Sequence, residues 1–119
     1  MNVKNVEKIK AFSGQEGTKI KQIFSPEDTS NIIRYSIAHC TINPSKTSRP
    51  HTMKTSEIYY ILDGSGTIHI GEEEKEVKKN DAVFVPPNFR QFLENKGKTD
   101  LVALCIVDPA WKQEDEISE

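Results

Sequence analysis

The chain has 119 residues, a formal net charge of -2, 35% hydrophobic residues and 29% charged residues. This length is enough for one modest core, so residues 1–119 are expected to form a single domain. The near-neutral charge excludes the basic footprint of proteins that bind nucleic acid or anionic membranes. No apolar run approaches the ~20 residues of a membrane span, and residues 1–10 lack the apolar core of a signal peptide. The expected location is therefore the cytoplasm.

Strand signals dominate the chain from residue 31 onward, as short runs of β-branched and aromatic residues separated by Gly, Pro and Asn. The predicted strands are Asn31–Asn43, Glu57–Leu62, Thr67–Ile70, Glu76–Lys78, Asp81–Val85, Gln91–Glu94 and Leu101–Val107. Short strands at even spacing are typical of a β-sandwich or barrel. The one helical candidate, Val3–Ala11, has a weak pattern. The acidic tail from Asp108 is expected to be an extension whose last residues are mobile.

Alternation along the strand Glu57–Leu62 predicts which side chains can meet inside a barrel. Successive side chains point to opposite faces, so an inward Glu57 predicts an inward Tyr59 and an inward Ile61. The side chains predicted to point outward are Ile58, Tyr60 and Leu62. Burying each large apolar side chain contributes ~1.5–3 kcal/mol, so we expect another part of the structure to cover this outward face. The cover would be a second sheet, the N-terminal arm or another subunit.

The glycine-rich segment after this strand predicts a tight hairpin. A two-residue turn at Gly64-Ser65 would place Tyr60 opposite His69, on the face away from Glu57. His69 is therefore interpreted as a cross-strand partner of Tyr60 rather than as a site residue.

The two cysteines, Cys40 and Cys105, both lie in predicted apolar strands. Their surroundings favour two buried thiols in a reducing compartment. A disulfide and a reactive pocket thiol are the alternatives, because the sequence does not place the two residues against each other.

Two stretches of the chain fit one spaced template. Ser45–Gly64 contains His51, Glu57 and a closing Gly64, and Asn80–Asn95 contains Pro86 and a closing Asn95. This resembles the paired motif of the cupin family. Its first half is Gly, five residues, His-x-His, three or four residues, Glu, six residues, Gly. Its second half is Gly, five residues, Pro-x-Gly, two residues, His, three residues, Asn. The residues standing where the family has glycine are Ser45, Asn80 and Asn88.

The resemblance implies an all-β fold, the cupin double-stranded β-helix or jelly-roll barrel, over about residues 34–107, followed by the acidic tail 108–119. The segments Ser56–Leu62 and Cys105–Trp111 look like small single-domain microbial cupins labelled mannose-6-phosphate isomerase-like. The isomerase in that label is treated as a fold analogy, because one fold hosts many functions. Cupins commonly form homodimers, and the outward apolar face supports the same expectation.

In cupins, two His and the Glu of the first motif and the His of the second hold a metal. Here His51 and Glu57 stand at ligand positions, and Met53 and Gln91 replace the other two His. One hypothesis is a divalent metal held by His51, Glu57 and Gln91, since imidazole, carboxylate and amide oxygen form a mixed site. The Met53 thioether suits copper(I) and poorly suits harder metals. The other hypothesis is a metal-free pocket, where His51 pairs with Glu57 while Gln91 and Tyr59 hydrogen-bond a ligand.

The predicted ligand pocket thus comprises His51, Met53, Glu57, Tyr59 and Gln91, and no catalytic residue is assigned. His39, on the preceding strand, is interpreted as a core or surface histidine, with replacement of the missing imidazole as the alternative. The favoured function is a small-molecule-binding cupin whose ligand is a sugar or an organic acid. The alternatives are a metal-dependent isomerase or dioxygenase using His51, Glu57 and Gln91, and a structural dimer with a vestigial cavity.

Overall fold

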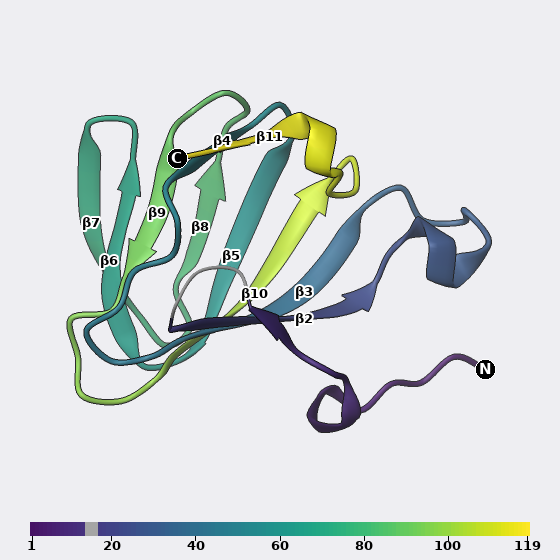
Figure 1. Ribbon diagram of the computed structural model, residues 1–119, viewed down its shortest axis with the longest axis horizontal. Coiled ribbons are helices and arrows are strands. Elements are labelled where there is room, and N and C mark those ends of the chain that lie inside the picture. Colours follow the sequence, from purple (N-terminus) through teal and green to yellow (C-terminus); the bar gives the residue numbers. More distant parts are fainter. Residues whose placement is uncertain (14–16) are drawn as a thin grey trace.

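The computed structural model describes residues 1–13 and 17–119 and consists of two antiparallel β-sheets that face each other (Figure 1). Sheet A contains, in spatial order, β1 (Phe12–Ser13), β2 (Thr18–Phe24), β3 (Ser36–Ile42), β10 (Leu101–Asp108), β5 (Ser56–Asp63) and β8 (Ala82–Val85). Sheet B contains β11 (Glu116–Ser118), β4 (His51–Met53), β9 (Gln91–Glu94), β6 (Ser65–Ile70) and β7 (Glu73–Lys78). This is the all-β jelly-roll barrel that the sequence predicts.

Helix is confined, in the described residues, to three short 3-10 turns, η1 (Val6–Lys8), η2 (Pro26–Thr29) and η3 (Gln113–Asp115). The helix predicted over Val3–Ala11 is wrong beyond η1, which ends after one turn when the chain extends again at Ile9. None of the described helices has the length and apolar character needed to cross a bilayer.

All seven predicted strands are present, as β3 and β5 to β10. The first is shorter than predicted, because left-handed backbone at Ser30 and Asn31 ends η2 and delays the strand until Ser36. Sequence reasoning missed β1, β2, β4 and β11. Sheet A therefore begins at residue 12 rather than near residue 34, and the C-terminal tail contributes a strand to sheet B.

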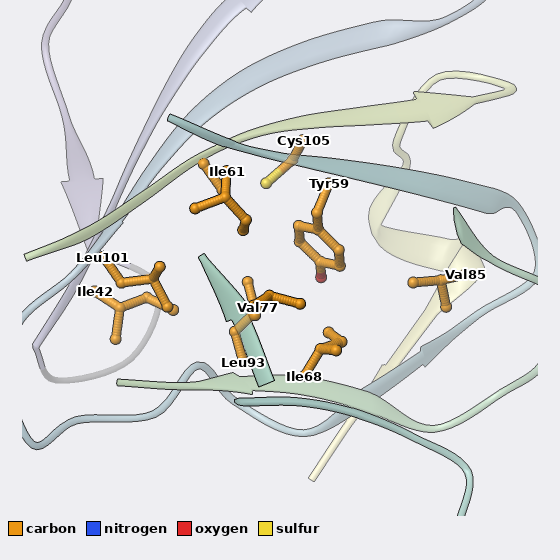
Figure 2. Packing of buried hydrophobic residues seen from close by; sticks show 10 residues of the cluster. Ile42, Tyr59, Ile61, Ile68, Val77, Val85, Leu93, Leu101 and Cys105 are labelled. Atoms are coloured by element: carbon orange, nitrogen blue, oxygen red, sulfur yellow. The ribbon is translucent and has the colours of Figure 1, made fainter. Parts of the chain in front are cut away.

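The core fills the space between the two sheets (Figure 2). In β10 every second residue is buried, as a strand with one face on a core requires. The most deeply buried apolar side chains are Ile61, Leu101, Val85, Leu93 and Ala103. Asn95, the closing residue of the second motif, is also buried. Its Nδ2 donates to the carbonyl oxygens of Ile42 and Thr99, each at 2.9 Å, and thereby fixes the adjacent loop.

Three turns retain a glycine-like backbone without glycine. Ser45, Asn80 and Asn88 have φ angles of 66°, 76° and 69°, in the left-handed region that side chains with a Cβ disfavour. These are the three positions where the cupin motif has glycine. Asn tolerates this conformation better than Ser, because its short side chain can hydrogen-bond locally.

The predicted hairpin between Tyr60 and His69 is wrong. β5 pairs with β10 and β8, while β6 pairs with β7 and β9, so the chain passes from sheet A to sheet B at Gly64. Gly64 has φ of 81°, and a Cβ there would lie 2.4 Å from the Asp100 carbonyl oxygen, so this backbone approach accepts only glycine. His69 instead stacks on Phe92, with ring centroids 4.1 Å apart.

Candidate functional site

A cavity of about 290 Å³ opens between the two sheets beside the core. Four of the predicted pocket residues line it, namely His51, Met53, Glu57 and Tyr59. The fifth, Gln91, is not part of the lining; it is 1% exposed and lies behind Tyr59. A larger surface depression of about 420 Å³ lies over β6 and β7 and contains none of the predicted residues. The cavity between the sheets is therefore the candidate site.

The inward face of β5 supplies the acidic side of the cavity. Glu57, Tyr59 and Ile61 are buried, whereas Ile58 and Tyr60 are 41% and 38% exposed, so the predicted alternation is confirmed. Glu57 is 5% exposed, and its Oε1 has no hydrogen-bond partner among the described residues. An orphaned buried carboxylate oxygen is costly, so this atom requires a donor or a cation.

His51 faces Glu57 from the other sheet. Its Nε2 lies 3.9 Å from Oε1 of Glu57, and its Nδ1 lies 2.8 Å from the carbonyl oxygen of Arg49. A carbonyl only accepts, so Nδ1 must carry a proton and donate to it. Nε2 then either carries a second proton, giving an imidazolium paired with Glu57, or presents a lone pair to the carboxylate.

The surroundings of His51 favour its protonated form. Burial acts to lower the pKa of His51, but the attraction of the Glu57 carboxylate, the hydrogen bond to the Arg49 carbonyl and the charge of Glu116 outweigh it. The net result is a pKa raised above the usual value of the histidine side chain. His51 of sheet B and Glu57 of sheet A thus attract each other across the cavity when His51 is protonated.

Tyr59 and Gln91 form the second polar link across the cavity end of the core. The Tyr59 hydroxyl donates to Oε1 of Gln91 at 2.5 Å. Burial, reinforced by the charge of Glu57, raises the pKa of Tyr59 well above its usual value, so Tyr59 remains a neutral donor. Gln91 pairs directly with His51 in the β4–β9 register. The motif spacing therefore brings the second-motif residue next to the first-motif histidine.

The cupin four-ligand metal site does not fit these residues. Within residues 1–13 and 17–119, no three His, Cys, Asp or Glu side chains gather as a metal-binding group. Met53 is buried in the lining at one ligand position, and the Gln91 oxygen at another already accepts from Tyr59. The smaller site of His51, Glu57 and Gln91 stays a prediction, and it requires Gln91 to release that hydroxyl.

Several lining residues were not predicted as part of the pocket, namely Arg49, Trp111, Glu116 and Ser118. Cys40 and Cys105 also line it, a position that the sequence left only as an alternative. Three of the unpredicted residues come from the tail, where β11 pairs with β4 and the Trp111 indole donates to Glu116 at 2.9 Å. The composition of the tail does not predict this strand, because β11 is only three residues long and its partner β4 lies more than 60 residues earlier in the chain. His39 is absent from the lining, as the favoured interpretation predicts. Burial and the nearby charge of Lys21 lower the pKa of His39.

The comparisons with known proteins agree with this architecture. The sequence profile of the cupin domain matches residues 38–107. The chain is 33% identical over 110 residues to an uncharacterized protein of Methanocaldococcus jannaschii, covering 92% of this chain and 87% of that protein. It is 29% identical to mannose-1-phosphate guanylyltransferase of Salmonella montevideo, covering 96% of this chain but 25% of that enzyme's length. It is also 37% identical, over 51 residues, to the oxalate-binding protein of Thermotoga maritima, covering 43% of this chain and 42% of that protein.

Solved structures show the same fold. A predicted oxalate decarboxylase from Thermotoga maritima superposes with a TM-score of 0.78 at 25% identity, covering 89% of this chain and 97% of that one. Oxalate decarboxylase of Bacillus subtilis superposes with a TM-score of 0.81 at 19% identity, over 95% of this chain and 30% of that one. The family profile covers more than half of the chain, and the strands it spans build the barrel described above. The chain therefore belongs to the cupin family.

Proposed function

We propose that this cupin binds a small organic molecule in the cavity between its two sheets. The observation that carries the proposal is the buried Oε1 of Glu57, which lines the cavity and has no hydrogen-bond partner among the described residues. Buried polar atoms of native proteins are paired in the great majority of cases. A ligand that donates a hydrogen bond to this oxygen satisfies it.

The chemistry of the lining favours a hydroxyl-bearing ligand over a plain dicarboxylate. Glu57 accepts hydrogen bonds and repels a second carboxylate placed against it, whereas a hydroxyl donates to it. The apolar lining residues, among them Met53 and Trp111, suit the carbon skeleton of such a molecule. Arg49, also in the lining, suits an anionic group at the other end of the ligand.

The names of the relatives supply the probes. A sugar phosphate is the class suggested by the mannose-1-phosphate guanylyltransferases, and oxalate is the class suggested by the oxalate-binding protein. We place the protein in the cytoplasm, whose reducing conditions suit the two free thiols of Cys40 and Cys105.

The test is thermal unfolding with mannose 1-phosphate, mannose or oxalate, together with native mass spectrometry of the freshly purified protein. A ligand at 100 times its Kd stabilises the native state by about 2.7 kcal/mol, which raises Tm measurably. We expect the hydroxyl-bearing probes to raise Tm more than oxalate, and Glu57→Gln to reduce the rise. No shift with any probe and no co-purifying molecule would leave a structural dimer with a vestigial cavity as the better account.

A metal-dependent isomerase or dioxygenase using His51, Glu57 and Gln91 is the second candidate. One observation favours it. When Nε2 of His51 is unprotonated, its lone pair and Oε1 of Glu57 face each other at 3.9 Å, and a cation would satisfy both atoms. Elemental analysis after mild purification separates the candidates. Stoichiometric divalent metal that His51→Ala removes, with a loss of stability, would support the enzyme and count against the metal-free pocket.

A further inference from the structure

The lining of the cavity contains two thiols in direct contact. Cys40 on β3 and Cys105 on β10 both line the cavity, and their Sγ atoms are 2.9 Å apart. Both are free cysteines. In the register of the two strands, Cys40 faces Ala103 and Cys105 faces Ala38, so the two thiols occupy diagonal positions on the inward face of sheet A.

We propose that Cys40 and Cys105 form a redox modification site, a dithiol that a hydroperoxide converts into an intramolecular disulfide within the pocket lining. Diagonal Cα atoms of an antiparallel pair are typically ~7–8 Å apart, which is just beyond the usual Cα separation of ~4.4–6.8 Å in a disulfide. Here the two Sγ atoms are already 2.9 Å apart, so the side-chain directions favour a bond and only a small backbone shift is needed. A disulfide bond is about 2.05 Å long, so closure requires only a small further movement.

The two cysteines are suited to different steps of the reaction. Cys40 is half-buried and Cys105 is buried, so Cys40 is the sulphur that a small oxidant entering the cavity meets first. The hydrogen bond with Cys40, burial and the charge of Glu57 raise the pKa of Cys105 well above its usual value. Cys105 is therefore held as a protonated thiol beside its partner, in the place of a resolving cysteine.

The chemistry balances in two steps. The Cys40 thiolate attacks one oxygen of hydrogen peroxide, the O–O bond breaks, and Cys40 becomes a sulfenic acid while hydroxide leaves and takes up a proton. The Cys105 sulphur then attacks the sulfenic sulphur, the S–O bond breaks, and the Cys105 proton leaves with the hydroxyl group as water. Overall two thiols lose two electrons and two protons, and one peroxide becomes two waters. A small dithiol such as dithiothreitol reverses the change by thiol–disulfide exchange.

Oxidation at this site alters the pocket itself. Cys105 pairs directly with Tyr59 in the β10–β5 register, and Figure 2 shows the two side chains next to each other. Disulfide formation removes two S–H groups from the lining and ties β3 to β10 next to the Tyr59 ring. The oxidation state of the dithiol would thus set the shape of the cavity, whichever molecule binds there.

The test is intact-mass spectrometry of the folded protein before and after hydrogen peroxide, with Cys40→Ser and Cys105→Ser as matched variants. The wild type should lose the mass of two hydrogen atoms, regain it with dithiothreitol, and yield a cross-linked Cys40–Cys105 peptide in a non-reducing digest. Cys105→Ser should instead gain oxygen atoms on Cys40, whereas Cys40→Ser should leave the buried, protonated Cys105 largely unmodified.

Three results would overturn the proposal. The wild type could gain oxygen atoms on its cysteines as Cys105→Ser does, it could form covalent dimers as its main product, or its thiols could remain unmodified by peroxide in the folded state. The wild-type digest decides the matter even where a serine variant fails to fold, because it requires no substitution.

Discussion

The Tyr59 hydroxyl of sheet A donates a hydrogen bond to Oε1 of Gln91 in sheet B, at an O–O distance of 2.5 Å. Both residues are buried, and Gln91 lies opposite His51 in the register of β4 and β9. This one bond connects the two sheets beside the cavity, and it also determines what Gln91 can offer to a ligand. The amide oxygen of Gln91, which stands where the cupin motif has a metal-binding His, is engaged by a neutral phenol.

Removing the hydroxyl of Tyr59 should therefore destabilise the protein. Tyr59→Phe leaves the buried oxygen of Gln91 without its donor, and an unsatisfied buried group costs about 1–3 kcal/mol. Urea unfolding followed by circular dichroism measures the change. Tyr60→Phe is the matched control, because the Tyr60 hydroxyl bonds Asn80 at the exposed surface and should be worth less. Equal losses in the two variants would show that the inter-sheet bond has no special weight.

The pairing of His51 with Glu57 should make stability depend on pH in a defined direction. The pKa of His51 is raised in the folded state, so the folded protein binds the proton more tightly than the unfolded chain. This contribution is fully present below the unfolded pKa of about 6.5 and is lost as pH rises through the higher folded pKa. The Tm advantage of the wild type over His51→Gln should shrink over that window. An advantage that instead grew with pH would contradict the protonated pair.

Restoring the missing imidazoles should create a metal site. Met53 and His51 are two residues apart on one face of β4, and Gln91 lies opposite His51. The double variant Met53→His with Gln91→His should bind a divalent metal tightly, as titration calorimetry and elemental analysis would measure. Adding His51→Ala to the same background should weaken that binding. If the double variant takes up no metal, the placement of His51 and Glu57 in one cavity is wrong.

The outer face of β5 and β8 should mediate a homodimer. Ile58 pairs with Phe84 across these strands, and the two residues are 41% and 61% exposed, with Tyr60 nearby at 38%. β8 is the edge of sheet A, so this apolar face continues to a free edge, which favours association. Sedimentation equilibrium at micromolar concentration should report a dimer, and Phe84→Lys should shift it to monomer. Ile32→Lys, at an exposed position outside this face, should leave the dimer intact; a monomeric wild type would refute the expectation.

Glycine at Ser45 should stabilise the fold. Ser45 holds a left-handed conformation, which costs residues with a Cβ about 1–2 kcal/mol, and glycine adopts it freely. Because glycine also loses more entropy on folding, the net gain of Ser45→Gly should be about 0.5–1 kcal/mol. Asn80→Gly should gain less, since Asn tolerates this backbone. Chemical unfolding compares both with the wild type, and a less stable Ser45→Gly would contradict the explanation.

The sequence predicted well those features that depend on local periodicity and spacing. The alternation of Glu57, Tyr59 and Ile61 follows from the geometry of a strand, so these side chains point inward as expected. The motif spacing also predicted that Gln91 would lie near His51. The local pattern could not show that Gln91 lies behind the cavity lining rather than in it. That position follows from the hydrogen bond that Gln91 accepts from the Tyr59 hydroxyl, which comes from a distant strand.

The features that the sequence did not predict depend on contacts between distant segments. The apparent hairpin at Gly64 is a crossing between sheets, and the sheet that receives β6 is determined by β7 and β9. The contact between Cys40 and Cys105 requires the β3–β10 register, which joins residues 65 positions apart. Short strands such as β4 and β11 carry too few residues for a periodic signal, so only their partners define them.

The pairing of β11 with β4 has a practical consequence for anyone who purifies this protein. β4 touches β9 at the single pair of His51 and Gln91, whereas β11 accompanies it along its whole length. The strand that carries His51 is thus held in place chiefly by residues 116–118. Next to them, Nε of Arg90 donates a hydrogen bond to Oε2 of Glu119 at 2.6 Å. A tag fused after Glu119 is expected to disturb the pairing of β11 with β4 and so the position of His51. The N-terminus lies on the far side of the molecule (Figure 1). Binding assays should therefore use an N-terminal tag, or none.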